Sequence, residues 1–159
     1  TAIFVYLLLK WGLLGDMMIN AYYFIMSVYG WYIWTRTVDG TAVTPITTTS
    51  KKEHIISVGI FITAVVFTYV VYITFDKISH WTSYIDMITT GIFFVGMWLM
   101  AKRKIENWIY WIIGDIITVP LYFYKGLIFS SILYFALTII AVFGYLEWKK
   151  NLDKSLAAV

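Results

Sequence analysis

Three carboxylic acids stand inside long apolar stretches of this 159-residue sequence: Asp16, Asp86 and Asp115. An ionisable side chain within a membrane helix costs roughly 2.5–3.5 kcal/mol on insertion scales, so each acid is a functional hypothesis by default. Lys and Arg are absent from the depths of these stretches, and acids without a basic partner suit a cationic or heavily hydroxylated ligand. Asp16 and Asp86 lie near expected helix starts, where capping the helix is the alternative role, whereas Asp115 is mid-helix.

Aromatic, hydroxyl and amide groups accompany each acid on one helix face, at about 100° per residue. The three stripes are Trp108, Trp111, Asp115, Thr118 and Tyr122; Asp16, Asn20, Tyr23 and Ser27; and Asp86, Thr90 and Phe93. Such a mixture binds a planar ring by stacking and a cationic ring by cation–π attraction, while acids and amides hydrogen-bond the hydroxyls of a sugar. An interfacial aromatic belt is the alternative for the tryptophans, and it fits Trp111 poorly.

The composition indicates an integral membrane protein. The chain is 61% hydrophobic and only 13% charged, whereas a soluble domain is roughly 45–50% apolar and about 25% charged. The lack of cysteine excludes disulfides and thiolate metal sites. The net charge of +3 resides at the ends of apolar runs, which argues against nucleic acid. His54 and His80 are expected in separate loops, and no nucleotide-binding or hydrolase motif is present, so we expect no metal, no cofactor and no enzyme.

A membrane-spanning helix needs roughly 20 mostly apolar residues. Five stretches qualify, and a sixth is a helix fragment: 13–34, 55–75, 84–101, 108–124, 127–148, and the fragment 1–9. Residues 35–54, 76–83 and 102–107 are polar connections, and Pro120 is expected to bend its helix. The apolar runs are continuous and too long for barrel strands, so the prediction is an all-α polytopic membrane protein.

One helix occurs twice. Residues 12–34 match residues 126–148 at a constant offset of 114, with Gly30 paired to Gly144 and Trp34 to Trp148. The same offset places the counterpart of 84–114 before Thr1. The expected architecture is therefore three helices, one linker helix and three helices, with both halves running the same way as a parallel repeat.

This scheme divides the chain into functional segments. Residues 1–34 end the first three-helix repeat, 35–54 form a cytoplasmic loop, 55–75 the linker helix, 84–148 the second repeat and 149–159 a cytoplasmic tail. Nine of the Lys and Arg residues fall on one side and three on the other, and the richer side is expected to be cytoplasmic. The C-terminus then lies inside the cell.

Several blocks of this sequence resemble the PnuC family of bacterial vitamin transporters. They are Asn20-x-x-Tyr23 leading into Tyr29-Gly30-Trp31-Tyr32-x-Trp34, the run Lys104–Asp115, the run Val119–Leu127, Leu133-Tyr134, and Gly144-Tyr145-x-x-Trp148. The resemblance implies a 3+1+3 fold of SWEET-like arrangement in the bacterial inner membrane. It also implies facilitated diffusion of nicotinamide riboside, a cationic pyridinium ring on a ribose, which cytoplasmic phosphorylation then traps.

The resemblance also implies a substrate site between the halves. Trp111, Asp115 and Tyr122 would line it, Asn20 and Tyr23 would face them from the first half, and the weaker candidates are Asp86, Thr90 and Tyr134. Thiamine, another cationic ring, is the alternative substrate, and related members carry riboflavin or deoxynucleosides. The sequence is also compatible with a homo-oligomer. A scaffold or sensor subunit that does not transport is an alternative function.

Overall fold

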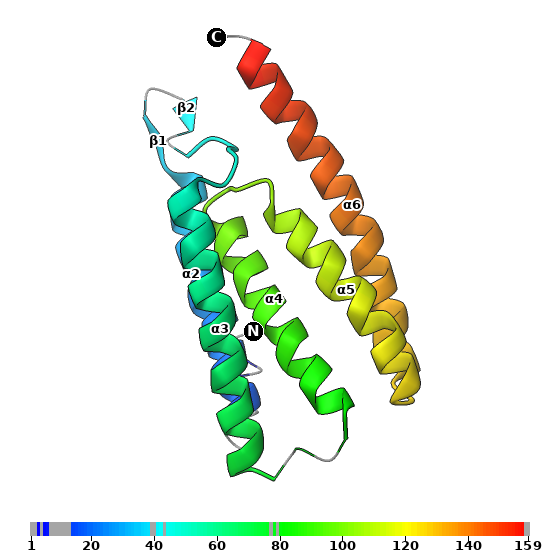
Figure 1. Cartoon of the computed structure of the whole chain (residues 1–159). Helices are drawn as coiled ribbons and strands as arrows, with labels where there is room; N and C mark the ends of the chain where they lie inside the picture. Colours follow the sequence, from blue (N-terminus) through cyan, green and yellow to red (C-terminus); the bar gives the residue numbers. More distant parts are fainter. Residues whose placement is uncertain are drawn as a thin grey trace.

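The computed structural model describes residues 3, 5–6, 14–38, 41–42, 44–76, 78 and 80–157. In that part of the chain the long elements are α2 (Leu14–Thr35), α3 (Lys51–Thr74), α4 (Thr82–Ala101), α5 (Asn107–Tyr124) and α6 (Ile128–Ala157) (Figure 1). Lys10, Trp11, Gly12, Leu13 and Lys77, together with most of the expected fragment 1–9, lie outside the described residues. The side chain of Asp16 lies outside them as well.

The helices pack in the order α3, α4, α5 and α6, with α2 against α4 (Figure 1). Three of them are long and apolar enough to cross a membrane: Lys51–Thr74, Trp81–Ala101 and Ile128–Ser155. Helices α2 and α5, which are not among these three, carry acids, amides and ring hydroxyls between their apolar residues. These two helices hold most of the predicted substrate-site residues: Asn20 and Tyr23 on α2, and Trp111, Asp115 and Tyr122 on α5.

Helix α3 buries small residues and exposes large apolar ones, the arrangement expected of a helix that faces lipid. Its buried residues are the small Ser57, Ala64 and Thr68, whereas its large aliphatic side chains point outward, with Ile55 73% and Val58 58% exposed. The inward hydroxyls are satisfied within the helix, because Ser57 donates to the carbonyl of Glu53 and Thr68 to that of Ala64, each at 2.8 Å. Such an apolar exterior is stable in a bilayer, where the lipid chains solvate it.

Two helix boundaries differ from the sequence prediction. Helix α3 begins at Lys51 instead of Ile55, because Ser50 and Glu53 form a capping box: the Ser50 N–H donates to Glu53 Oε2 at 2.9 Å and the Glu53 N–H donates to Ser50 Oγ at 3.3 Å. His54 consequently belongs to a helix and not to a loop. Helix α6 continues to Ala157, so the polar segment after Trp148 is helical.

The connection before α3 also has structure of its own. Strands β1 (Thr37–Val38) and β2 (Thr41–Ala42) form an antiparallel pair, a small exception to the all-α prediction. Farther along, Thr47 donates its N–H to the carbonyl of Arg103 at 3.2 Å and accepts from the N–H of Ile105 at 3.0 Å. We call the contact between residues 44–50 and residues 102–106 the clasp.

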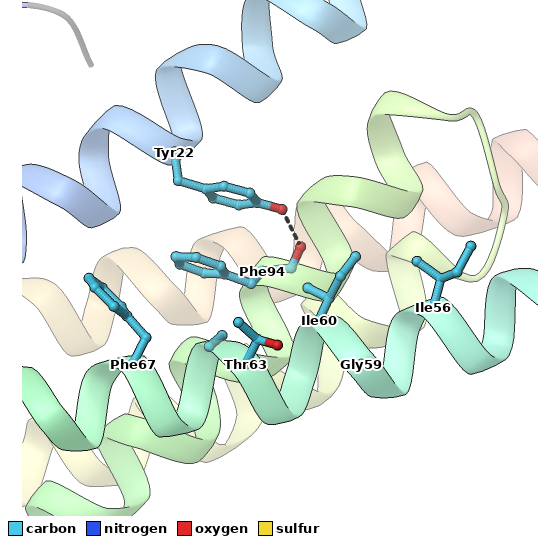
Figure 2. Close-up of a pocket in the computed structure, with 8 residues that line it drawn as sticks. Tyr22, Ile56, Gly59, Ile60, Thr63, Phe67 and Phe94 are labelled. Carbon is cyan, nitrogen blue, oxygen red and sulfur yellow. Dashed lines mark hydrogen bonds between the residues drawn. The ribbon is translucent and has the colours of Figure 1, made fainter.

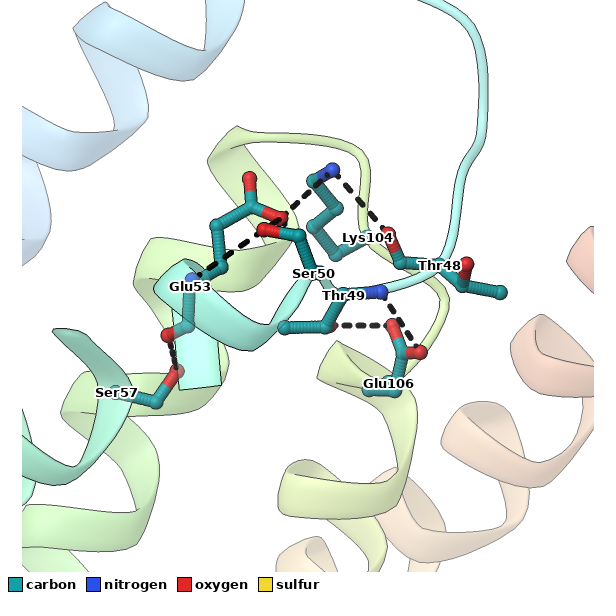
Figure 3. Close-up of polar contacts among 7 residues, drawn as sticks. All are labelled: Thr48, Thr49, Ser50, Glu53, Ser57, Lys104 and Glu106. Atoms are coloured by element: carbon teal, nitrogen blue, oxygen red, sulfur yellow. Dashed lines mark hydrogen bonds and ion pairs between the residues drawn. The ribbon is translucent and has the colours of Figure 1, made fainter. Parts of the chain in front are cut away.

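Side chains reinforce the clasp (Figure 3). Glu106 accepts hydrogen bonds from the N–H of Thr49 at 2.9 Å and from its hydroxyl at 2.6 Å. Lys104 pairs with Glu53 of the capping box at 3.0 Å. The segment that leaves α2 is thereby fixed to the turn between α4 and α5, at one end of the bundle (Figure 1).

Helix α5 ends in a Schellman motif. The N–H of Gly126 donates to the carbonyl of Phe123 at 3.0 Å, and that of Leu127 donates to the carbonyl of Tyr122 at 2.9 Å. Gly126 has φ of +75°, the left-handed conformation that this motif requires and that glycine adopts without penalty. The motif reverses the chain within a few residues and fixes the position of Lys125.

Replacing Gly126 with alanine should destabilise the protein by about 1 kcal/mol, because an L-residue with a Cβ is strained at positive φ. Gly59 within α3 is the matched control, since an added Cβ would meet nothing within 4 Å at either glycine. Gly59→Ala should be neutral or slightly stabilising, as alanine favours a helix interior. Unfolding in detergent micelles measures both changes, and equal effects of the two substitutions would contradict the turn argument.

Candidate functional site

A close approach of α4 and α5 organises the centre of the bundle. Gly114 lies on α5 directly against the ring of Phe93 from α4, where an added Cβ would overlap the ring. The missing side chain lets Phe93 stack on Trp111, with ring centroids 5.3 Å apart. The neighbouring Asp115 is 2% exposed, so its carboxylate is held inside the bundle beside these rings.

Four rings from three helices form what we call the aromatic cluster: Phe93, Trp111, Tyr122 and Tyr134. Tyr134 of α6 lies 6.0 Å from Phe93 in a stacked arrangement and meets Tyr122 of α5 edge-on at 5.2 Å. Tyr23 of α2 lies near Tyr122 and Tyr134, and its ring centre is 5.8 Å from that of Phe94 on α4. The structure thus brings together four of the predicted residues, Tyr23, Trp111, Tyr122 and Tyr134, beside Asp115.

The hydroxyl groups of the helices are mostly bonded to their own backbone. Thr90 donates to the carbonyl of Asp86 at 2.7 Å, Thr118 to that of Gly114 at 2.8 Å, and Thr138 to that of Tyr134 at 2.9 Å. These bonds satisfy the groups in an environment that offers no water. Thr90, a predicted site residue, therefore has its hydroxyl proton committed within α4.

A few buried side-chain atoms are not satisfied in this way. Within the part of the chain that the structure describes, the buried atoms without a hydrogen-bond partner are Arg103 Nε, Asn107 Oδ1, Trp108 Nε1, Trp111 Nε1 and Asp115 Oδ1. Trp111 and Asp115 are one turn apart on α5, against the aromatic cluster. Buried polar atoms are normally paired, so this donor and acceptor are available to a ligand.

Asp86 does not have the environment that the sequence predicted. It forms an ion pair with Lys125, so the expectation that the intramembrane acids lack a basic partner is wrong at this position. Asp86 is not a helix cap either, since α4 begins at Thr82 and its N-cap, Trp81, makes no side-chain capping bond. The turn after α5 returns the chain to the start of α4 and supplies the lysine. Among the described residues, Asp115 takes part in neither of the two ion pairs.

Sequence reasoning did not assign roles to two residues of this region. Phe93 was placed on the stripe of Asp86 but not among the site residues, although the seven-residue spacing already put it on the acid's face. Lys125 falls in the short gap between the predicted helices 108–124 and 127–148, where the sequence indicates no partner for it. Its pairing depends on two segments that are 39 residues apart, which helical periodicity within one segment cannot reveal.

A separate groove lies between α2, α3 and α4 (Figure 2). Its volume is about 540 Å³, and it is lined by Tyr22, Ile56, Gly59, Ile60, Thr63, Ala64, Phe67 and Phe94. Tyr22 stacks on Phe94 with ring centroids 4.0 Å apart and donates its hydroxyl proton to the carbonyl of Phe94 at 2.9 Å. None of the predicted site residues lines this groove, and it presents no charged group, so it suits apolar chains better than a cation.

Comparison with known proteins places the chain in a family. Residues 1–150 match the sequence model of the family described as nicotinamide mononucleotide transporter. The chain belongs to this family. The family description and the names of the relatives given below are those of transporters, which agrees with the apolar helices and with the resemblance to PnuC noted from the sequence.

Two curated relatives illustrate the range of the family. The nicotinamide riboside transporter PnuC of Escherichia coli is 22% identical over 163 residues, covering 86% of this chain and 66% of the relative. The riboflavin/roseoflavin transporter RibM of Streptomyces davaonensis is 26% identical over 130 residues, covering 77% of this chain and 58% of the relative. The chain thus spans about two thirds or less of the length of these relatives.

The fold is shared with a solved transporter. The crystal structure of the vitamin B3 transporter PnuC matches 95% of this chain and 68% of its own, with a TM-score of 0.58 and 21% sequence identity. This likeness supports a multi-pass membrane fold of the PnuC type.

Substituting Gly114 with alanine should lower the melting temperature in detergent by several degrees, because overpacking costs about 1–3 kcal/mol. The added Cβ would displace the Phe93 ring from Trp111. Gly96→Ala is the control, since its Cβ would lie at a tolerable 3.4 Å from Trp111 and Tyr110. Phe93→Leu, combined with Gly114→Ala, should recover part of the loss. An unchanged melting temperature in Gly114→Ala would show that the contact does not hold α4 and α5 together.

Proposed function

We propose that this protein is a facilitated-diffusion uniporter for nicotinamide riboside. The observation that carries the proposal is the buried, unpartnered pair of Trp111 Nε1 and Asp115 Oδ1 beside the aromatic cluster. A positively charged pyridinium ring is attracted by aromatic faces and by a carboxylate, and the ribose hydroxyls need hydrogen-bond partners. The name of the Escherichia coli relative, nicotinamide riboside transporter PnuC, points to the same substrate.

The predicted residues take distinct roles in this proposal. The aromatic cluster receives the ring, Asp115 accepts from ribose hydroxyls or faces the ring charge, and Trp111 donates to an oxygen of the substrate. Asn20 and Tyr23 of α2 complete the site from the first half. Asp86 and Thr90 have smaller roles, because the first is paired with Lys125 and the second is bonded to its own helix.

A contact between repeat-related residues supports transport by two parallel halves. Trp34 of α2 and Trp148 of α6 are related by the offset of 114, and their rings lie 5.8 Å apart. Equivalent residues meet each other when they lie close to a two-fold axis that relates two halves. This supports the 3+1+3 parallel repeat, in which residues 1–34 and 84–148 belong to the halves and 55–75 link them. Alternating access then consists of one half rocking against the other.

The charge distribution supports an orientation. The hairpin β1–β2, the turn between α4 and α5 and the C-terminal end of α6 all lie at one end of the bundle (Figure 1). The basic residues assigned to this end are Arg36, Lys51, Lys52, Lys102, Arg103, Lys104, Lys149, Lys150 and Lys154. The positive-inside rule makes it cytoplasmic, with segments 35–54 and 149–159 inside a bacterial cell and the substrate trapped there by phosphorylation.

Thiamine is the second candidate substrate, because it is also a cationic ring and the acid–aromatic arrangement suits it equally. Riboflavin, named for the Streptomyces relative, is a larger ring. Competition by unlabelled thiamine and riboflavin against labelled nicotinamide riboside ranks the three substrates in one assay.

Proteoliposomes that contain the protein should take up labelled nicotinamide riboside down its gradient, and Asp115→Asn should weaken substrate affinity by about 10- to 100-fold. Losing a hydrogen bond to a charged group costs about 1.5–3 kcal/mol. Asp153→Asn, an exposed carboxylate near the end of α6, is the control and should behave as the wild type. Absence of wild-type flux would refute the proposed function, whereas wild-type affinity in Asp115→Asn would remove only this carboxylate from the site.

A further inference from the structure

Lys125 occupies a position that the proposed function does not explain. The Schellman motif at the end of α5 fixes its backbone, and its N–H donates to the carbonyl of Leu121 at 3.1 Å. From there its ammonium group pairs with the carboxylate of Asp86 and lies 5.9 Å from the centre of the Tyr122 ring. A cation is therefore held between a carboxylate and an aromatic face.

This ion pair lies at the rim of the aromatic cluster. Lys125, the partner of Asp86, lies over the ring of Tyr122, which belongs to the cluster. The side chains of Lys125 and Asp86 remain 27% and 18% exposed, so the pair is accessible from outside the bundle. The turn between α5 and α6 lies at the opposite end from the clasp (Figure 1).

We propose that Lys125 is a specificity-determining residue: a tethered cation that occupies the place of a substrate cation at the rim of the cluster. Its ammonium makes the two contacts that a pyridinium ring would seek, a carboxylate and a tyrosine face. By neutralising Asp86 it prevents this acid from holding a cationic substrate at the entrance. The inference rests on the proposed function, since it concerns how the same site discriminates cations.

The physical reason for such an arrangement lies in the needs of transport. A substrate must bind well enough to enter and weakly enough to leave, and two unpaired acids, Asp86 and Asp115, would hold a cation at two successive places. With Lys125 paired to Asp86, the rim is electrically neutral and Asp115 remains the attractive charge. The alternative is that the ion pair only fastens the α5–α6 turn to α4.

A double-mutant cycle separates these two roles. The variants are Lys125→Met, Asp86→Asn and the double substitution, and uptake into proteoliposomes is measured with nicotinamide riboside and with its reduced dihydropyridine form, which has nearly the same size and no charge. Lys102→Met is the control, because Lys102 lies 5.0 Å over the Trp98 ring at the clasp end.

If Lys125 acts as a tethered cation, the two single substitutions should change KM for the cationic substrate in opposite directions. Lys125→Met should lower KM for the cation about two- to fivefold, the range for a partly exposed ion pair. Asp86→Asn should raise it by a similar factor, and the double variant should return near the wild type. The neutral form and the Lys102→Met control should show little change.

The remaining outcomes overturn the inference. A purely structural ion pair predicts that both single variants lose uptake of the charged and neutral forms alike, with lower melting temperatures in detergent. Should Lys125→Met fail to fold, the Asp86→Asn variant still decides, because an unchanged ratio of the two KM values contradicts the role of charge. A wild type that carries no nicotinamide riboside refutes the proposed function and this inference together, whereas wild-type uptake with the wrong signs refutes the inference alone.

Discussion

A bilayer offers no hydrogen bonds, and this constraint accounts for most of the polar chemistry inside the bundle. Every backbone or side-chain group at membrane depth must find a partner within the protein. The hydroxyls of Thr68, Thr118 and Thr138 each donate to a carbonyl one turn earlier on the same helix. Ser131 instead donates across to the carbonyl of Val119 on α5, at 2.8 Å. These buried hydroxyls thus form hydrogen bonds to carbonyls of their own helix or of the adjacent helix.

Against this background, unpaired atoms are informative. Trp111 Nε1 and Asp115 Oδ1 are buried at the aromatic cluster, and among the described residues neither atom has a hydrogen-bond partner. A carboxylate in such a place costs stability, and this cost is the physical ground for the proposal that Asp115 contacts the substrate. Gly114 and Phe93 hold Trp111 in position. The glycine leaves room for the Phe93 ring, and Trp111 stacks on that ring.

The sequence predicted those features that a single helix encodes. Helical spacing placed Trp111, Asp115 and Tyr122 on one face; in the structure Trp111 stacks on Phe93, Tyr122 meets Tyr134 edge-on, and Asp115 is buried. The capping box of Ser50 and Glu53 is also a local signal, although the residues between them are charged and looked like a loop. The pairing of Asp86 with Lys125 could not be predicted from the sequence, since it depends on how the turn after α5 packs against the start of α4. Tertiary contacts between distant polar residues leave no periodic trace in the sequence.

The two copies of the repeated helix agree at some positions and differ at others, and the structure places these two kinds of position in different surroundings. Where the copies agree, at Trp34 and Trp148, the rings meet each other and join the helices near the clasp end. Where they differ, Tyr23 of α2 lies near Phe94 of α4, with ring centres 5.8 Å apart, whereas its counterpart Leu137 is 38% exposed. The identical residues thus lie at a contact between the two helices, and the positions that differ give the two helices different chemistry. A ring joined to a sugar is itself two-sided, so a site with unlike walls can fix its direction in a way that a symmetric site could not.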